Sequence, residues 1–436
     1  MTHRSFPDAL EIIPLKKPPE ATIRVPGSKS ITNRALIMGA LSDPIQGCEI
    51  HGALCSEDTE IMIAALRELG FSVRTDWEKS WIHVKRGSHE SPIPAEKADL
   101  FVGNSGTSMR FLTALVSLGH GVYRLDGVAR MRERPMSDLL RALRQLGVEA
   151  CSERGDGYPP IVVYGGGLKG GKASISGKVS SQFLSGLLMA VPLACEDTCI
   201  EVDGVLVSRP YVDMTVRMMR EFGVRVDVEG TNHLFVPCNQ WYQSRQYEVE
   251  PDATAAGYFF GAAAITNGEV RVLSLHPRGL QGDIQFVHVL RRMGCDIISR
   301  CGATEFSLTG EHLYGIEVDM NDISDCVMTL GAVACFAEGP TTIRNVAHIR
   351  HKETDRLTAL ANELRKVGAE VDEFPDGLKI TPRPLHGAEI ETYNDHRMAM
   401  SMALIGLRVP GIIIKNPGCV AKTYPGFFDD LEKLRQ

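Results

Sequence analysis

The sequence lacks the segments that direct a chain into or across a membrane. No apolar run approaches the roughly 18 residues that a spanning helix needs. The longest apolar stretches, 255–265 and 326–337, are shorter, and we predict buried helices there. The first 20 residues contain no apolar core, so we expect neither a signal peptide nor a transit peptide. These absences favour a cytoplasmic protein.

Cysteine motifs typical of metal or redox sites are also missing. The 11 cysteines include no CxxC pair. The nearest neighbours, Cys195/Cys199 and Cys295/Cys301, have no histidine at zinc-ligand spacing beside them. We therefore expect reduced and mostly buried thiols, with no disulfide framework and no metal site.

An excess of positive charge is absent too. The chain has 47 Lys and Arg against 54 Asp and Glu, which gives a formal net charge of −7. Binding to nucleic acid requires a basic surface that neutralises phosphates, so this charge argues against such a partner. Any anion-binding site has to come from basic residues that are concentrated locally.

A helix end followed by a strand recurs along the chain. Each copy has an acidic residue near the helix start, apolar residues at helical spacing, basic residues in the last turn and then a glycine. The glycines are 71 to 77 residues apart: Gly70, Gly147, Gly223, Gly294 and Gly368. One copy would be an ordinary helix exit, whereas five near one period predict a repeated module. A truncated sixth copy, 431–434, closes the chain.

The length of 436 residues suggests two to three domains, and six modules divide naturally into two groups of three. A period near 70 residues is too long for a solenoid repeat, so each module is predicted to be a compact unit of helices and strands. The composition changes from polar to Ala-rich across 240–255, which predicts a boundary there.

Small polar residues with a lysine or arginine precede several predicted helices. Alone, each is more often a helix cap or a solvated charge run. We expect Thr107 or Ser108 to cap one helix, and Lys352 and Arg356 to share a face of another. Together, such helix N-termini would attract a substrate with several negative charges if they met in one cleft. The segments are 26–34, 103–110, 130–135, 180–182, 350–356, 394–397 and 422–425.

These segments, in this order, resemble the 5-enolpyruvylshikimate-3-phosphate (EPSP) synthase family. The matching motifs are PGSKSITNRAL, GNSGTSMR, RMRERP, SSQFLSGLLMA, KETDRL, YNDHRMAM and KTYPGFF. The resemblance implies an α+β fold of α/β-type repeats, the inside-out α/β fold of enolpyruvyl transferases. It has two domains, each of three βαβαββ modules: residues 27–248, and residues 1–26 plus 249–436. Hinges are expected near 24–27 and 247–252, with the active site in the cleft between the domains.

The resemblance also implies a reaction. The enolpyruvyl group of phosphoenolpyruvate would move to the 5-hydroxyl of shikimate 3-phosphate through a tetrahedral intermediate, with release of phosphate. This is a step of aromatic amino-acid biosynthesis, and it needs no cofactor. By resemblance, Asp325 is the base near the 5-hydroxyl, and Glu353 and Lys29 transfer protons. A monomer with two small-molecule substrates is expected.

The family's ligand-binding residues match positions in this sequence. Phosphoenolpyruvate would be held by Lys29, Gly106, Arg134, Gln182, Arg356, Arg397 and Lys422. Shikimate 3-phosphate would be held by Ser30, Arg34, Ser180, Ser181, Gln182, Ser208, Tyr211, Asp325, His348 and Lys352. Two positions depart from the family pattern, with Phe111 in place of the usual proline and His351 in place of valine. We hypothesise that Phe111 alters the fit of glyphosate, which competes with phosphoenolpyruvate in this family.

Two other functions are compatible with the same fold. One is an enolpyruvyl transferase that acts on UDP-N-acetylglucosamine, but this typically has a loop cysteine and a Lys-Asn motif where this chain has Lys29-Ser30. The other is a non-catalytic anion-binding protein. Retention of both acid–base carboxylates, Asp325 and Glu353, argues against that alternative.

Overall fold

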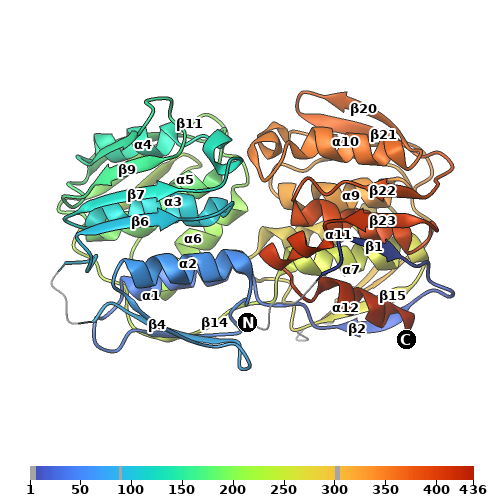
Figure 1. Ribbon diagram of the computed structural model, residues 1–436, viewed down its shortest axis with the longest axis horizontal. Helices are drawn as coiled ribbons and strands as arrows, with labels where there is room; N and C mark the ends of the chain where they lie inside the picture. Colours follow the sequence, from blue (N-terminus) through green and yellow to red (C-terminus); the bar gives the residue numbers. More distant parts are fainter. Residues whose placement is uncertain (1–5, 88–90, 300–304) are drawn as a thin grey trace. The chain divides into compact units, whose positions relative to one another are not determined.

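The protein folds into two compact units. A computed structural model describes residues 6–87, 91–299 and 305–436. Unit 1 comprises Met1–Pro26 and Glu250–Gln436, and unit 2 comprises Gly27–Val249 (Figure 1). The sequence placed residue 249 with the C-terminal half. Instead Val249 belongs to unit 2, where its backbone N–H donates to the carbonyl of His51 at 2.9 Å.

Unit 2 contains three modules, each built on a four-stranded sheet. Two are continuous in sequence and follow the order βαβαββ. The first is β6 (Lys97–Phe101), α3 (Gly106–Leu115), β7 (Val122–Asp126), α4 (Ser137–Gln145), β8 (Glu149–Ser152) and β9 (Ile161–Tyr164). The second is β10 (Gly171–Ser176), α5 (Ser181–Ala190), β11 (Thr198–Asp203), α6 (Pro210–Glu221), β12 (Asp227–Glu229) and β13 (His233–Val236).

The third module of unit 2 is discontinuous. Its helices and last three strands are α1 (Lys29–Ala40), β3 (Cys48–His51), α2 (Glu57–Glu68), β4 (Ser72–Asp76) and β5 (Trp81–Lys85). Its first strand is β14 (Gln246–Glu248), which pairs in parallel with β3 from the far end of the unit. The strands and helices of the other two modules therefore lie between the two parts of this module in the sequence.

Unit 1 repeats the arrangement. One module is β2 (Glu20–Ile23), α7 (Ala253–Thr266), β15 (Glu269–Leu273), α8 (Phe286–Arg292), β16 (Asp296–Ser299) and β17 (Glu305–Thr309). The next is β18 (Glu317–Asp319), α9 (Val327–Ala334), β19 (Thr341–Arg344), α10 (Arg356–Lys366), β20 (Glu370–Phe374) and β21 (Gly377–Thr381). The last is β22 (Ala388–Ile390), α11 (His396–Gly406), β23 (Ile412–Lys415) and α12 (Phe427–Glu432), with β1 (Ala9–Ile12).

Strand pairing confirms the predicted repeat. In each four-stranded sheet the first two strands are parallel and the following hairpin is antiparallel, as in β6-β7-β9-β8. The sixth sheet has only three strands, β1-β23-β22, and β1 lies antiparallel to β23 with Ala9 opposite Lys415. This sheet belongs to the truncated copy that the sequence predicted.

The five repeat glycines end their helices as expected. Gly70, Gly147, Gly223, Gly294 and Gly368 have φ between +85° and +113°. A side chain is strained in this left-handed region, so glycine is the residue that lets the chain leave the helix and enter the next strand.

Each unit is built around helices that are buried on all sides. In unit 2 these are α1, α3 and α5, and α3 packs against α1 and α5. In unit 1 they are α7, α9 and α11, which contact one another (Figure 1). A helix that is apolar all round has to be enclosed by protein. The predicted buried helices at 255–265 and 326–337 are thus confirmed as α7 and α9.

The expectation of mostly buried cysteines is wrong. Among the ten that the structure describes, only Cys48, Cys295, Cys326 and Cys335 are buried. Cys151 and Cys199 are exposed because they occupy outward-facing positions of β8 and β11, where alternate residues point to solvent. In the described ranges, no helix has both the length and the apolar character needed to cross a membrane.

Candidate active site

The predicted site residues fall into one set in each unit. All lie in the described part of the chain, near the N-terminal ends of helices. The unit 2 set is Lys29, Ser30, Arg34, Gly106, Arg134, Ser180, Ser181, Gln182, Ser208 and Tyr211. The unit 1 set is Asp325, His348, Lys352, Glu353, Arg356, Arg397 and Lys422. Helix N-termini carry partial positive charge and free N–H groups, which suits anion binding.

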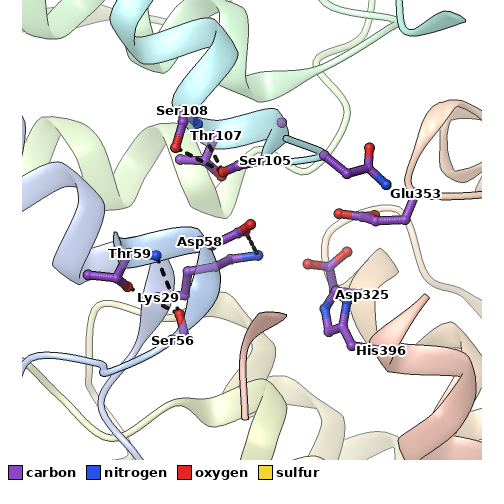
Figure 2. Close-up of polar contacts among 12 residues, drawn as sticks. Lys29, Ser56, Asp58, Thr59, Ser105, Thr107, Ser108, Asp325, Glu353 and His396 are labelled. Atoms are coloured by element: carbon purple, nitrogen blue, oxygen red, sulfur yellow. Dashed lines mark hydrogen bonds and ion pairs between the residues drawn. The ribbon is translucent and has the colours of Figure 1, made fainter. Parts of the chain in front are cut away.

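In unit 2, Lys29 is paired with a buried acid. Its ammonium lies 3.3 Å from the Asp58 carboxylate, and the Asp58 side chain is 1 % exposed (Figure 2). Lys29 is the first residue of α1, and Asp58 lies in the first turn of α2. Ser56 caps α2 by accepting from the N–H of Thr59, which fixes the turn that carries Asp58. The repeat predicted an acidic residue near the start of this helix, and the structure shows that this residue, Asp58, also holds Lys29.

The start of α3 lies directly against Arg134. Nη1 of Arg134 donates to the backbone carbonyl of Asn104 at 3.1 Å. A Cβ atom on Gly106 would lie only 2.4 Å from Nη2 of Arg134. Glycine at this position therefore leaves the space that the guanidinium fills. The cap of α3 is Ser105 rather than the predicted Thr107 or Ser108, because the helix begins at Gly106, two residues earlier than a Thr107 cap requires (Figure 2).

The three arginines of the basic run 130–134 differ in their partners and in their burial. Arg130 pairs with Glu133 at 2.8 Å, and Arg132 pairs with Asp126 at 2.7 Å. Asp126 is buried whereas Arg132 is partly exposed, and the Arg130–Glu133 pair lies largely at the surface, where such a bond contributes little to stability. Arg134, by contrast, is only 3 % exposed.

The shikimate-phosphate set of unit 2 comes together around Arg34 and the start of α5. Arg34 donates to the backbone carbonyls of Ser30 and Tyr211 at 2.9 and 3.1 Å. Ser180 caps α5 by accepting from the N–H of Gln182, and the Gln182 amide donates to Thr107 Oγ1 at 3.3 Å. Ser181 and Ser208 are buried beside these groups, at the starts of α5 and α6.

In unit 1, Arg356 is the centre of a buried ion cluster. Its Nε donates to Asp395 at 2.7 Å, Nη2 to Glu353 at 2.8 Å and Nη1 to Asp325 at 3.1 Å. Burial by itself would lower the pKa of Arg356, but the charges of Asp395, Glu353 and Asp325 outweigh it and the pKa is raised. Arg356 is therefore a permanent cation that holds the two predicted acid–base carboxylates. The side chains of Asp325 and Glu353 lie side by side (Figure 2).

Asp325 binds two further cations. Its Oδ2 accepts from Nη2 of Arg397 at 2.7 Å, and its Oδ1 lies 3.8 Å from the Lys352 ammonium. Nη1 of Arg397 also bonds to the hydroxyl of Tyr258 at 3.3 Å, which comes from α7. The positive charges in this cluster are thus compensated by carboxylates. The unit 1 set is therefore not uniformly positive, unlike the anion-attracting site that the sequence suggested.

Lys352 and Arg356 do not share a helical face, so that prediction is wrong. Residues 347–351 form a short 3-10 helix, after which Lys352 is extended with φ −85° and ψ −152°. A new helix, α10, begins at Arg356 because Asp355 caps it by accepting from the N–H of Thr358. The break allows Lys352 and Arg356 to approach the same oxygen of Asp325 from different directions.

His348 is a neutral group next to this cluster. Burial, together with the charge of Lys352, lowers its pKa from 6.5 to about 3. One ring nitrogen, Nε2, lies 2.9 Å from Ser324 Oγ. At neutral pH its imidazole is uncharged, so it can take part in hydrogen bonds without adding to the positive charge of the cluster.

Lys422, in the 3-10 helix Pro417–Lys422 before α12, is 6 % exposed.

Across the described ranges, no three or more His, Cys, Asp or Glu side chains form a group that could hold a metal ion.

Several residues that orient the site were not identified from sequence. Asp395 lies inside a quoted motif, two positions before Arg397, and an acid at that spacing from a helix start was a usable signal for a cap. Tyr258, Ser185 and Thr215 lie within apolar helical stretches that carry no such signal. Only their contacts with arginine from other helices reveal them.

The chain is similar to known proteins over nearly its whole length. The chain is 51 % identical over 423 residues to a 3-phosphoshikimate 1-carboxyvinyltransferase of Nostoc punctiforme, covering 97 % of this chain and 98 % of that one. It is 49 % identical to the enzyme of the same name from Trichormus variabilis over 428 residues, 98 % of this chain and 99 % of the relative. A solved structure of EPSP synthase from Acinetobacter baumannii matches with a TM-score of 0.81 at 27 % identity, covering 98 % of both chains.

The family profile matches from residue 15 to residue 431, which takes in both sets of site residues. The resemblance seen in the seven motifs is thus confirmed over nearly the whole chain. The chain belongs to the EPSP synthase (3-phosphoshikimate 1-carboxyvinyltransferase) family.

Proposed function

We propose that the protein transfers the enolpyruvyl group of phosphoenolpyruvate to the 5-hydroxyl of shikimate 3-phosphate and releases phosphate. The names of its relatives support this activity. The structural observation that carries it is the pair of carboxylates, Asp325 and Glu353, bound to one arginine, Arg356, beside Arg397 and Lys352. Such a cluster combines groups that move protons with groups that bind carboxylate and phosphate.

The chemistry is an addition followed by an elimination. Asp325 accepts the proton of the 5-hydroxyl while that oxygen forms a bond to C2 of phosphoenolpyruvate and C3 gains a proton. Loss of a proton from C3 then restores the double bond as the C2–O bond to phosphate breaks. Glu353 and Lys29 serve the proton transfers at C3 and at the leaving phosphate.

The binding roles follow the family pattern. Lys29, Gly106, Arg134, Gln182, Arg356, Arg397 and Lys422 bind phosphoenolpyruvate. Ser30, Arg34, Ser180, Ser181, Gln182, Ser208, Tyr211, Asp325, His348 and Lys352 bind shikimate 3-phosphate. Arginine suits these anions because its planar fork matches a carboxylate or phosphate with two parallel hydrogen bonds.

Both units contribute to one reaction in this proposal, with the substrates bound in a cleft between them. Shikimate 3-phosphate would draw the units together and so exclude water. We further infer that the protein acts as a cytoplasmic monomer without a cofactor. This closure can be tested with spin labels or fluorophores attached to cysteines introduced at exposed positions, one in each unit. The distance between the two labels should be shorter when shikimate 3-phosphate is bound.

Phosphate release tests the activity directly. Phosphate is expected only when both substrates are present, and UDP-N-acetylglucosamine should not replace shikimate 3-phosphate. Intact binding of both substrates without phosphate release would instead support the non-catalytic alternative. Release with UDP-N-acetylglucosamine would support the other transferase.

Asp325→Ala tests the assigned base. We expect turnover to fall by about 10²- to 10⁴-fold, the usual contribution of a positioned proton acceptor. Affinity for phosphoenolpyruvate should remain largely intact. Equal loss of turnover and of phosphoenolpyruvate affinity would show that Asp325 mainly orients Arg356 and Arg397.

A further inference from the structure

Arg34 is a buried cation with an unusual set of partners. It is 2 % exposed on α1. Its Nε donates to Thr215 Oγ1 at 2.7 Å, Nη1 to the carbonyl of Ser30 at 2.9 Å, and Nη2 to Ser185 Oγ and the carbonyl of Tyr211 at 3.2 and 3.1 Å. All of these acceptors are neutral.

No carboxylate compensates this charge in the described part of the chain. Burial lowers the pKa of Arg34 to about 10, which still leaves the guanidinium protonated at neutral pH. Arg356 in unit 1 shows the contrast, because three carboxylates surround it and its pKa is raised. A buried ion without a counter-charge is costly, so another source of negative potential near Arg34 is expected.

The ring of Phe111 supplies that potential. Phe111 lies on α3, is 1 % exposed, and has its ring centroid 5.1 Å from Cζ of Arg34. The face of an aromatic ring is negative and attracts a cation that lies over it. The attraction is strongest where water is excluded, as it is here for both side chains.

The hydrogen bonds leave one donor for a ligand. A guanidinium has five N–H groups. One on Nε, one on Nη1 and two on Nη2 are used, so one N–H of Nη1 has no acceptor among the described residues. The plane of the guanidinium determines where this N–H points, and the Phe111 ring, with its centroid 5.1 Å from Cζ of Arg34, limits how that plane can tilt.

We propose that Phe111 is a positioning residue for shikimate 3-phosphate. Its ring stabilises the buried charge of Arg34 and orients the remaining N–H toward an oxygen of that substrate. The proposal rests on the proposed function, in which Arg34 binds shikimate 3-phosphate. It assigns Phe111 to substrate recognition through Arg34, a role separate from the hypothesis about glyphosate.

The test replaces Phe111 with phenylalanines carrying one, two and three fluorines, and with leucine. Fluorine withdraws charge from the ring face with little change of shape. Calorimetry on the full chain should show shikimate 3-phosphate affinity falling stepwise, by about 2- to 30-fold in total. KM for phosphoenolpyruvate and kcat should change less than about twofold. The leucine variant should match the most fluorinated one.

Two controls separate this role from packing. Phe286 in unit 1 is a ring of similar burial, 1 % exposed, with no cation over it among the described residues, so Phe286→Leu should lower stability without changing shikimate 3-phosphate affinity. In an Arg34→Lys background, the compact ammonium cannot stack as the guanidinium does. The fluorine series should then lose its trend.

The outcomes are distinct. Wild-type protein that does not bind shikimate 3-phosphate would overturn the proposed function itself. Wild-type binding with the same affinity across the fluorine series would overturn only the role of Phe111. A trend that persists undiminished in Arg34→Lys would also overturn it, because Phe111 would then act other than through Arg34. If Phe111→Leu does not fold, the fluorine series decides.

Discussion

Asp395 joins Arg356 to the start of helix α11. One carboxylate oxygen accepts from Nε of Arg356 at 2.7 Å, and the other accepts from the backbone N–H of Arg397 at 2.9 Å. Asp395 is fully buried. A single side chain therefore fixes both the guanidinium that holds Asp325 and Glu353 and the helix that carries Arg397.

Loss of the Asp395 charge should affect both stability and activity. We expect Asp395→Ala to lower the free energy of unfolding by about 3–5 kcal/mol, because a buried cation loses its partner. Asp395→Asn keeps the shape and the cap, and should lower kcat/KM for phosphoenolpyruvate by about 10- to 100-fold. Urea unfolding and phosphate release measure the two effects.

The exposed pair Arg383–Glu370 provides the control for Asp395. Its side chains are 57 % and 55 % exposed, so Glu370→Gln should change neither stability nor kcat/KM appreciably. If Asp395→Asn behaves like Glu370→Gln, the charge of Asp395 is unimportant to the site.

Gly106→Ala should displace Arg134. The new methyl group would lie 2.4 Å from Nη2 and 2.8 Å from Cζ of Arg134, so the guanidinium has to move. We expect KM for phosphoenolpyruvate to rise by about 10- to 100-fold, the usual cost of a displacement near 1 Å in a site. Steady-state kinetics with saturating shikimate 3-phosphate gives this value.

Gly166→Ala is the matched control for Gly106→Ala, because no atom lies within 4 Å of a Cβ at Gly166. Its KM should equal that of the wild type. An unchanged KM for phosphoenolpyruvate in both variants would mean that the position of Arg134 against α3 does not affect binding of this substrate.

Stability should depend on pH through His348. Its pKa is about 3 in the folded protein and about 6.5 when exposed. Between these values the unfolded chain takes up a proton that the folded protein does not. Stability is therefore full above about pH 6.5 and falls as the pH is lowered toward 3, by at most about 1.4 kcal/mol per unit.

His348→Gln removes this titration. Urea unfolding at pH 7.5, 5.5 and 4.5 should show a smaller loss of stability for the variant than for the wild type. The difference between the two profiles cancels all other titrating groups. Parallel profiles would show that the imidazole becomes protonated in the folded protein.

Thr215→Val should weaken shikimate 3-phosphate binding through Arg34. The Thr215 hydroxyl accepts from Nε of Arg34 at 2.7 Å and donates to the carbonyl of Tyr211 at 2.8 Å. Without it a buried donor of Arg34 loses its acceptor, at a cost of about 1–3 kcal/mol in stability. We expect KM for shikimate 3-phosphate to rise about 5- to 10-fold.

Thr113→Val is the control for Thr215→Val. Thr113 is also buried in a helix of unit 2, but among the described residues its hydroxyl bonds only to the carbonyl of Met109 in its own helix, at 2.6 Å. It should lower stability and leave KM for shikimate 3-phosphate unchanged. A similar rise in KM for both variants would trace the effect to general loosening of the unit.

Much of the fold could be predicted because it depends on local rules. Glycine is the residue that leaves a helix in the left-handed region, so Gly70 and its four counterparts marked the modules. Helices that are apolar all round, such as α7 and α9, have to be buried wherever they occur. The sequence did not show that β14 and β2 complete modules far away in the chain, because strand pairing over such distances leaves no local pattern.

The features of the site also divide into those that the local sequence predicts and those that depend on contacts between distant segments. Lysines, arginines and carboxylates at helix starts can be recognised in the sequence, so the residue types that carry the chemistry were predictable. Their partners depend on how the helices pack: Asp58 for Lys29, Asp395 for Arg356, and the ring of Phe111 for Arg34. These partners come from other helices, and the strength of each contact depends on burial, which is a property of the packed protein and not of any one segment.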